Sequence, residues 1–117
     1  MHFTAADRDG YRVVCGRSNW EKHRRRHPEL TGREAWVRRA IADPHFIYHS
    51  LNVPNRRMFH RLYRVGQNVE TLRVIVEYNR QGPRTALEGV VVSAFMLQGA
   101  RKGEVLLWSN SNPVPDQ

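Results

Sequence analysis

The feature that most constrains the fold is a change of sequence period at His45. Before that residue, apolar side chains recur at the three- and four-residue spacing of helices, and after it they alternate between turn residues as in strands. Because short turns join the predicted strands, the sheet is expected to be antiparallel. The sequence therefore predicts an α+β fold in which two N-terminal helices pack on one face of a four- to five-stranded antiparallel sheet.

Each predicted helix begins with the spacing of a capping box and ends before a proline, which disfavours a helical backbone in the preceding residue. The first helix is expected over residues 18–27 and the second from residue 31 to residue 42. The two capping boxes are Ser18 with Glu21 and Thr31 with Glu34, and the prolines are Pro28 and Pro44.

The rest of the chain reads as strands and turns within a single domain that spans residues 1–117. Residues 1–10 are expected to be a polar lead and residues 109–117 a loose tail, so the core should lie within residues 11–108. The predicted strands are 11–15, 46–51, 57–65, 71–78, 89–97 and 104–108. The strand at 89–97 is the most apolar, which favours a central place in the sheet.

The charge of the chain indicates a polyanionic partner. The formal net charge is +8, and residues 1–64 hold 14 of the 19 basic side chains but only 6 of the 11 acidic ones. Seventeen of the basic residues are arginines, whose planar guanidinium suits bidentate contacts with phosphate. We therefore expect RNA, or nucleic acid more broadly, as the partner.

Cysteine count and hydropathy limit the cellular setting. Cys15 is the only cysteine, so the chain cannot form an internal disulfide. No cationic segment followed by an apolar run opens the chain, and no apolar stretch approaches the ~20 residues that span a bilayer. These features predict a cytoplasmic protein without a membrane partner.

Two histidines on the first helix are the first candidates for chemistry. Trp20, His23 and His27 share one helical face, with Trp20 expected to be buried against the sheet. Imidazole titrates near neutrality, so either histidine suits acid–base catalysis, although both also fit structural roles. The spacing of four would suit half of a zinc site, but no Glu follows His23 and no third ligand stands out, so we expect neither metal nor cofactor.

Two later strands carry polar residues in unusual places. The strand at 57–65 has a cation or an imidazole on each face, so Arg61 or Arg64 is expected in a cleft or at the end of the strand. Ser93 interrupts the apolar run at 89–97. A solvated edge strand and a serine bonded to a backbone carbonyl are the corresponding structural interpretations.

These features occur together in a recognisable order. A W-x-x-H-x-x-x-H-P-E-L segment at residues 20–30 is followed by Asp43-Pro44, by the strand 57–61 and by Val92-Ser93-Ala94-Phe95. Over residues 11–108 the chain resembles the phage and mobile-element domains of the barnase–EndoU–colicin–RelE-like nuclease superfamily. Ser93 stands where the related pattern often has Thr, and Arg24 where it often has an apolar residue.

The resemblance implies a metal-independent ribonuclease of the toxin or phage-effector type, which cleaves RNA by attack of the ribose 2′-OH on the adjacent phosphorus. Candidate catalytic residues are His23 and His27 as acid or base, Arg61 for the phosphoryl charge, and Ser93 to orient the phosphate. Candidate substrate-binding residues are Arg24, Arg25, Arg57, Tyr63 and Trp108. Small basic nucleases are commonly neutralised by an acidic antitoxin or immunity protein, which is a second expected partner.

Two other function classes remain open at this point. The chain could be a non-catalytic nucleic-acid-binding module, or a basic interaction protein that meets an acidic partner through the Arg24–Arg26 and Arg38–Arg39 surface. A geometric criterion separates the enzyme from the binding module: His23 or His27, Arg61 and Ser93 should line a single cleft.

Overall fold

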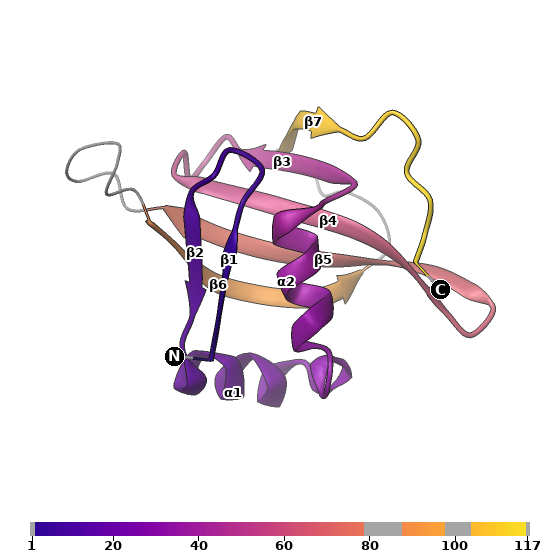
Figure 1. The fold of residues 1–117 in the computed structure, drawn as a ribbon, viewed down its shortest axis with the longest axis horizontal. Helices are drawn as coiled ribbons and strands as arrows, with labels where there is room; N and C mark the ends of the chain where they lie inside the picture. The colour runs from indigo at the N-terminus through magenta and orange to yellow at the C-terminus, as the bar shows by residue number, and fades with distance from the viewer. Residues whose placement is uncertain (1, 79–87, 98–103, 117) are drawn as a thin grey trace.

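The structure, a computed structural model, describes residues 2–78, 88–97 and 104–116. Over these ranges one seven-stranded sheet carries two α-helices and a short 3₁₀-helix (Figure 1). In chain order the elements are β1 (Phe3–Ala6), β2 (Arg12–Cys15), α1 (Arg17–Arg26), η1 (Pro28–Leu30), α2 (Glu34–Ala42), β3 (Phe46–Ser50), β4 (Arg56–Val65), β5 (Asn68–Tyr78), β6 (Glu88–Leu97) and β7 (Glu104–Ser109).

The α+β class and the two helices are as predicted, but the predicted four- to five-stranded antiparallel sheet is wrong. The strand order is β1-β2-β6-β5-β4-β3-β7, and the sheet is mixed because β2 runs parallel to β6. The expected polar lead at residues 1–10 contains β1, which pairs with β2 ahead of both helices. A parallel pair needs a long crossover connection, here everything from α1 to β5, and local sequence period cannot show such a pairing.

The two α-helices end before the prolines, as predicted, but they do not begin at the predicted capping boxes. The backbone N–H of His27 caps α1 just before Pro28, and Asp43 caps α2 before Pro44. Both predicted capping boxes are wrong: α1 begins after Gly16, α2 begins after Arg33, and neither start has a side-chain cap. The Glu21 carboxylate bonds Arg24 at 2.6 Å instead.

The hydrophobic core lies between the helices and one face of the sheet, which we call the helix face. Trp20 from α1 and Ile41 from α2 are buried in one cluster with alternate residues of β4 and β5, among them Phe59, Leu72 and Val74. Trp20 is only 2% exposed, which confirms its prediction as an anchor. Phe3 of β1 also joins this cluster, so the core begins earlier than residue 11.

The opposite side of the sheet, which we call the second face, is unusually polar. Because side chains alternate along a strand, it carries His60 of β4, Arg73 of β5, and Ser93 and Phe95 of β6. Met58 is buried there without joining the core cluster. His60 and Arg73 are only 2% and 3% exposed, so a charged side chain and an imidazole are buried outside the apolar core.

The C-terminal segment is attached to the sheet rather than loose as predicted. The backbone of Asp116 donates to the Leu62 carbonyl at 3.0 Å and accepts from the Arg64 N–H at 2.7 Å. This bridge places the Asp116 carboxylate over β4 on the helix face, beside Arg61.

Candidate active site

His23 hydrogen-bonds to the edge of the sheet at β6. Strand β2 pairs with β6 only as far as Val90, so the rest of that edge of β6 faces α1. The Nε2 of His23 lies 3.1 Å from the Val91 carbonyl, which also accepts from the Asn19 amide at 3.3 Å. Burial lowers the pKa of His23, so its ring is a neutral donor to that carbonyl. This geometry favours the structural interpretation of His23.

His27 lies at the same edge but turns toward the second face. Its ring stacks on Phe95 with centroids 5.2 Å apart, and its side chain is 32% exposed. The Glu29 carboxylate lies 3.5 Å from its Nδ1. His27 is therefore an accessible imidazole with a carboxylate beside it, at the border of the second face.

A row of directly paired residues crosses the second face from β6 to β3. Phe95 is opposite Arg73, Arg73 is opposite His60, and His60 is opposite Phe46. Directly opposite residues on one face have Cβ atoms about 5 Å apart. With His27 stacked on Phe95, the row places an imidazole, an aromatic ring, a guanidinium and a second imidazole in sequence.

Arg73 is the centre of a buried polar group, here named the Arg73 cluster: Tyr48, His60, Arg73 and Glu104. The Glu104 carboxylate binds both terminal nitrogens of Arg73, one of them at 2.6 Å. His60 Nε2 lies 3.2 Å from Arg73 Nη1, and the rings of Tyr48 and His60 are 4.8 Å apart. His60 of β4 and Glu104 of β7 therefore fix the orientation of the guanidinium, and Tyr48 of β3 packs against His60.

The electrostatics of the cluster keep His60 neutral. Burial, followed by the charge of Arg73, lowers the pKa of His60 to about 4, and Glu104 only partly opposes this. The neutral ring accepts a hydrogen bond from Arg73. Within the described part of the chain, the Nε of Arg73 is the one buried side-chain nitrogen or oxygen without a hydrogen-bond partner. The Nε–H of Arg73 is thus a hydrogen-bond donor that is not used within the described residues.

Ser93 shares this face with the cluster. It pairs with Ile75 on β5, two residues along from the Arg73–Phe95 pair, and it is partly buried. Of the four predicted catalytic residues, the structure therefore brings His27 and Ser93 to one face and leaves His23 engaged at the edge.

Arg61 lies on the helix face and pairs with Asp116. Its Nε and Nη2 each lie 2.9 Å from a carboxylate oxygen of that residue, and its side chain is 5% exposed. Arg61 also donates to the Asp43 carbonyl. The expectation of a single cleft with Arg61 and Ser93 is therefore wrong, because strand alternation places the two side chains on opposite faces of the sheet.

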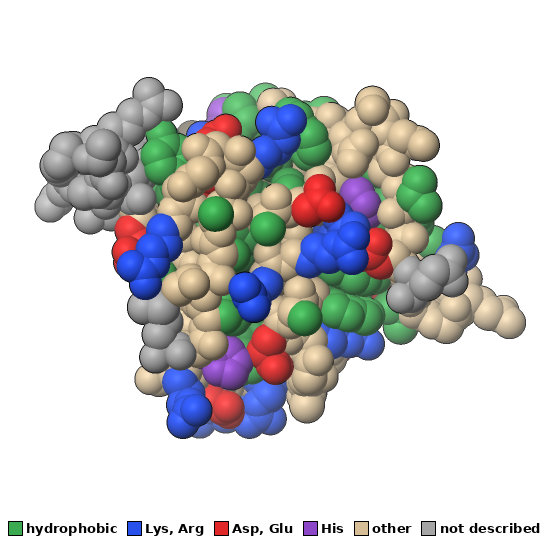
Figure 2. Space-filling view, viewed as in Figure 1, with side chains coloured by type: hydrophobic (Ala, Val, Ile, Leu, Met, Phe, Trp, Pro, Cys, Tyr) green, Lys and Arg blue, Asp and Glu red, His purple; other side chains and the backbone are tan. Residues whose placement is uncertain are grey.

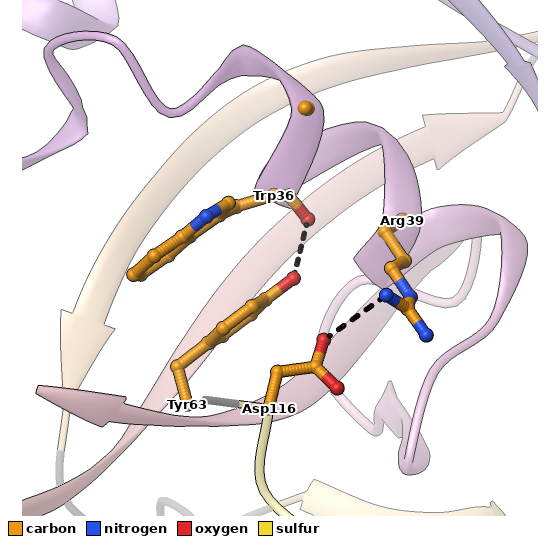
Figure 3. Close-up of a pocket in the computed structure, with 5 residues that line it drawn as sticks. Trp36, Arg39, Tyr63 and Asp116 are labelled. Carbon is orange, nitrogen blue, oxygen red and sulfur yellow. Dashed lines mark hydrogen bonds and ion pairs between the residues drawn. The ribbon is translucent and has the colours of Figure 1, made fainter.

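Tyr63 accompanies Arg61 on the helix face. Its ring stacks on Trp36 of α2 with centroids 4.1 Å apart, and its hydroxyl donates to the Trp36 carbonyl at 3.3 Å. A pocket of about 310 Å³ opens beside this pair, with Arg39 and Asp116 as polar walls (Figure 3). Burial raises the pKa of Tyr63 to about 12, so its hydroxyl stays protonated at neutral pH.

The other predicted substrate-binding residues are dispersed. Arg57 pairs with Asp9 at 2.6 Å, and Trp108 lies under the Arg8 guanidinium at 4.1 Å and packs against the core cluster. Arg24 pairs with Glu21, whereas Arg25 is exposed. The exposed cations of α1 are Arg17, Lys22, Arg25 and Arg26, and Figure 2 shows Lys and Arg side chains along the edge where α1 runs.

Sequence reasoning placed all four members of the Arg73 cluster in predicted strands but gave none of them a role in the site. One signal was available: Arg73 stands between Leu72 and Val74 in the otherwise apolar segment 72–76, and a cation in such a segment needs a partner. Glu104, the partner, lies 31 residues away, and only the tertiary structure identifies it.

Across residues 2–78, 88–97 and 104–116, no group of three or more His, Cys, Asp or Glu side chains is placed to hold a metal ion. Neither helix described is long and apolar enough to cross a membrane. Comparison with known proteins found no protein-family model, no curated protein and no solved structure that matches this chain.

Proposed function

We propose that the protein is a metal-independent ribonuclease whose active site lies on the second face, between His27 and the Arg73 cluster. In this reaction His27 takes the proton of a ribose 2′-OH, and the 2′ oxygen forms a bond to the adjacent phosphorus. The bond from phosphorus to the 5′ oxygen breaks, and that oxygen leaves with a proton from water. Arg73 stabilises the charge on the phosphoryl oxygens, and Ser93 orients the phosphate.

The observation that carries this proposal is the row on the second face. It combines an accessible imidazole, His27, with a fixed cation, Arg73, on the face that also bears Ser93. His60 and Glu104 act as positioning residues, because both hold Arg73: His60 Nε2 lies 3.2 Å from Nη1, and the Glu104 carboxylate binds both terminal nitrogens. Glu104 binds the terminal nitrogens of Arg73 and the Nε is buried, so a phosphate reaches the guanidinium by exchange with the Glu104 carboxylate.

RNA is the expected substrate because the exposed arginines and lysine of α1 border the same edge of β6 that His27 occupies. Such cations neutralise the phosphates that flank a scissile bond. Phe95 next to His27 supplies an aromatic surface on which a base can stack.

The test is incubation of the purified protein with mixed RNA in EDTA, followed by analysis for 2′,3′-cyclic phosphate ends. His27→Ala should lower the cleavage rate by roughly 10²–10⁴-fold, the usual loss for an acid–base group. Arg73→Gln should be similarly severe. Arg38→Ala on the exposed side of α2 is the matched control and should cleave at the parent rate. Circular dichroism confirms that each variant is folded.

The proposal fails if folded His27→Ala cleaves at the parent rate, or if EDTA stops a reaction that magnesium or zinc restores. Binding of RNA without cleavage would instead support the second candidate, a non-catalytic nucleic-acid-binding module. That candidate rests on the exposed cations of α1 and does not need the histidines.

A further inference from the structure

The pocket on the helix face resembles an anion-binding site in which the Asp116 carboxylate takes the place of a ligand. Arg61 directs Nε and Nη2 at the Asp116 carboxylate, both at 2.9 Å, and Arg39 approaches the same carboxylate at 3.5 Å. Two guanidinium groups therefore converge on one carboxylate. This fork-like geometry is the one by which arginine binds carboxylate and phosphate alike.

The Asp116 carboxylate separates the pocket from Arg61. Asp116, Arg39, Trp36 and Tyr63 line the pocket (Figure 3). Arg61 does not line it, because its side chain is bonded to Asp116 and is only 5% exposed. If the Asp116 side chain moves away, the pocket extends to Arg61, and both guanidinium groups lose this anion. Arg61 keeps the Asp43 carbonyl and the exposed Asp43 carboxylate, which lies 3.5 Å from Nη1, but its buried Nε and Nη2 are left without an acceptor. Leaving buried guanidinium nitrogens unpaired is unfavourable, so an anion of similar shape would bind there in place of Asp116.

The walls of the pocket indicate what the anion would be attached to. Trp36 stacks on Tyr63 at 4.1 Å with an interplanar angle of 2°, and the Arg33 guanidinium lies over the Trp36 ring at 4.2 Å. The indole therefore has Tyr63 on one face and Arg33 on the other, and a flat group stacks on it by taking the place of the Arg33 guanidinium. A pocket of about 310 Å³ is at the lower end of the range for small-molecule sites.

We infer that this pocket binds a phosphomonoester that carries a flat ring, such as a nucleotide or the 5′-phosphate end of a nucleic acid, and that Asp116 occupies the phosphate position in its absence. A doubly charged phosphate suits two guanidinium groups better than a carboxylate does. The site lies on the opposite side of the sheet from His27 and Arg73, so it does not depend on the proposed cleavage reaction.

Asp116→Ala tests the inference by opening the site. Inorganic phosphate, AMP, and a 2′-O-methyl oligonucleotide with or without a 5′-phosphate are titrated against parent and variant by calorimetry. None of these probes can be cleaved by 2′-OH attack, so a failure of the ribonuclease proposal does not affect the result. The apparent Kd for AMP should fall at least about tenfold in Asp116→Ala, because the parent binds only in the fraction that has released Asp116.

Control variants separate this site from general charge effects. Glu77→Ala also removes a carboxylate from an arginine, but from the partly exposed Arg56, and should leave the Kd of AMP unchanged. Arg61→Leu added to Asp116→Ala should abolish the gain. A stronger effect of the 5′-phosphorylated oligonucleotide than of AMP identifies a nucleic-acid end as the ligand, and the reverse identifies a free nucleotide.

The inference is overturned if folded Asp116→Ala binds AMP no better than the parent, or if Glu77→Ala gains as much. Should Asp116→Ala not fold, the parent protein decides the question by NMR. Titration with AMP should then shift the Nε–H signal of Arg61 and the backbone N–H signal of Asp116 together, and unchanged signals at millimolar AMP reject the site.

Discussion

Replacing His60 with glutamine tests the electrostatics of the Arg73 cluster. Glutamine keeps a hydrogen-bond acceptor beside Arg73 but removes the titratable ring. Burial and the charge of Arg73 lower the pKa of His60 from 6.5 to about 4. Because the folded pKa lies below the unfolded one, the unfolded chain binds the extra proton between these values. The folded state therefore loses stability as the pH falls from about 6.5 to about 4.

The magnitude follows from the two pKa values. Each pKa unit corresponds to about 1.36 kcal/mol, so the full difference for this buried ring is about 3 kcal/mol. The assay is urea denaturation at several pH values between 4 and 7, with the free energy of unfolding extrapolated to water. The parent should lose stability more steeply with falling pH than His60→Gln, by about 3 kcal/mol over the whole interval.

Two other histidines supply the background. Burial also lowers the pKa of His23 and His45, so these rings destabilise both proteins equally at low pH and cancel in the comparison. Parallel pH profiles for the parent and a folded His60→Gln would refute the argument, because the ring would then titrate alike in the folded and unfolded chains.

Three further predictions concern packing and binding. Trp20→Ala should lower the free energy of unfolding by roughly 3–5 kcal/mol in urea titrations, and a loss below about 0.5 kcal/mol would contradict its burial. Gly89→Ala should cost about 1–3 kcal/mol by the same measurement, since a Cβ there would lie 2.6 Å from Val76 Cγ1; an unchanged midpoint would show that β6 can shift. RNA affinity should fall steeply with salt, and combined Arg25→Ala and Arg26→Ala should flatten the plot of log K against log salt; an unchanged slope would exclude α1 from the RNA contact.

Local backbone chemistry made part of this fold readable from the sequence. A proline restricts the residue before it whatever the rest of the chain does, so Pro28 and Pro44 correctly marked the ends of both helices. The apolar alternation after His45 likewise revealed the antiparallel strands β3 to β6, because period and face are properties of the strand itself. Burial of Trp20 followed from its place on an otherwise charged helix.

The candidate site could be predicted only in part, because the faces and partners of its residues depend on tertiary structure. His27 and Ser93 were named from the sequence, but the cation that shares their face was assigned to Arg61 rather than Arg73. Arg61 lies on a strand with polar residues on both faces and Arg73 lies in a mostly apolar segment, but neither local pattern shows which face of the sheet the side chain occupies. Strand register and the burial of each guanidinium against a distant carboxylate decide which face and which partner each one has.

What the sequence by itself determined is therefore what neighbours along the chain impose: the helix ends, the strand period and the excess positive charge in residues 1–64. Only the tertiary structure decided the pairing of β2 with β6, and of Arg61 with Asp116 across 55 residues. Such pairs form because burying a charge without a partner is costly. Each buried arginine therefore pairs with a carboxylate that the folded sheet places next to it.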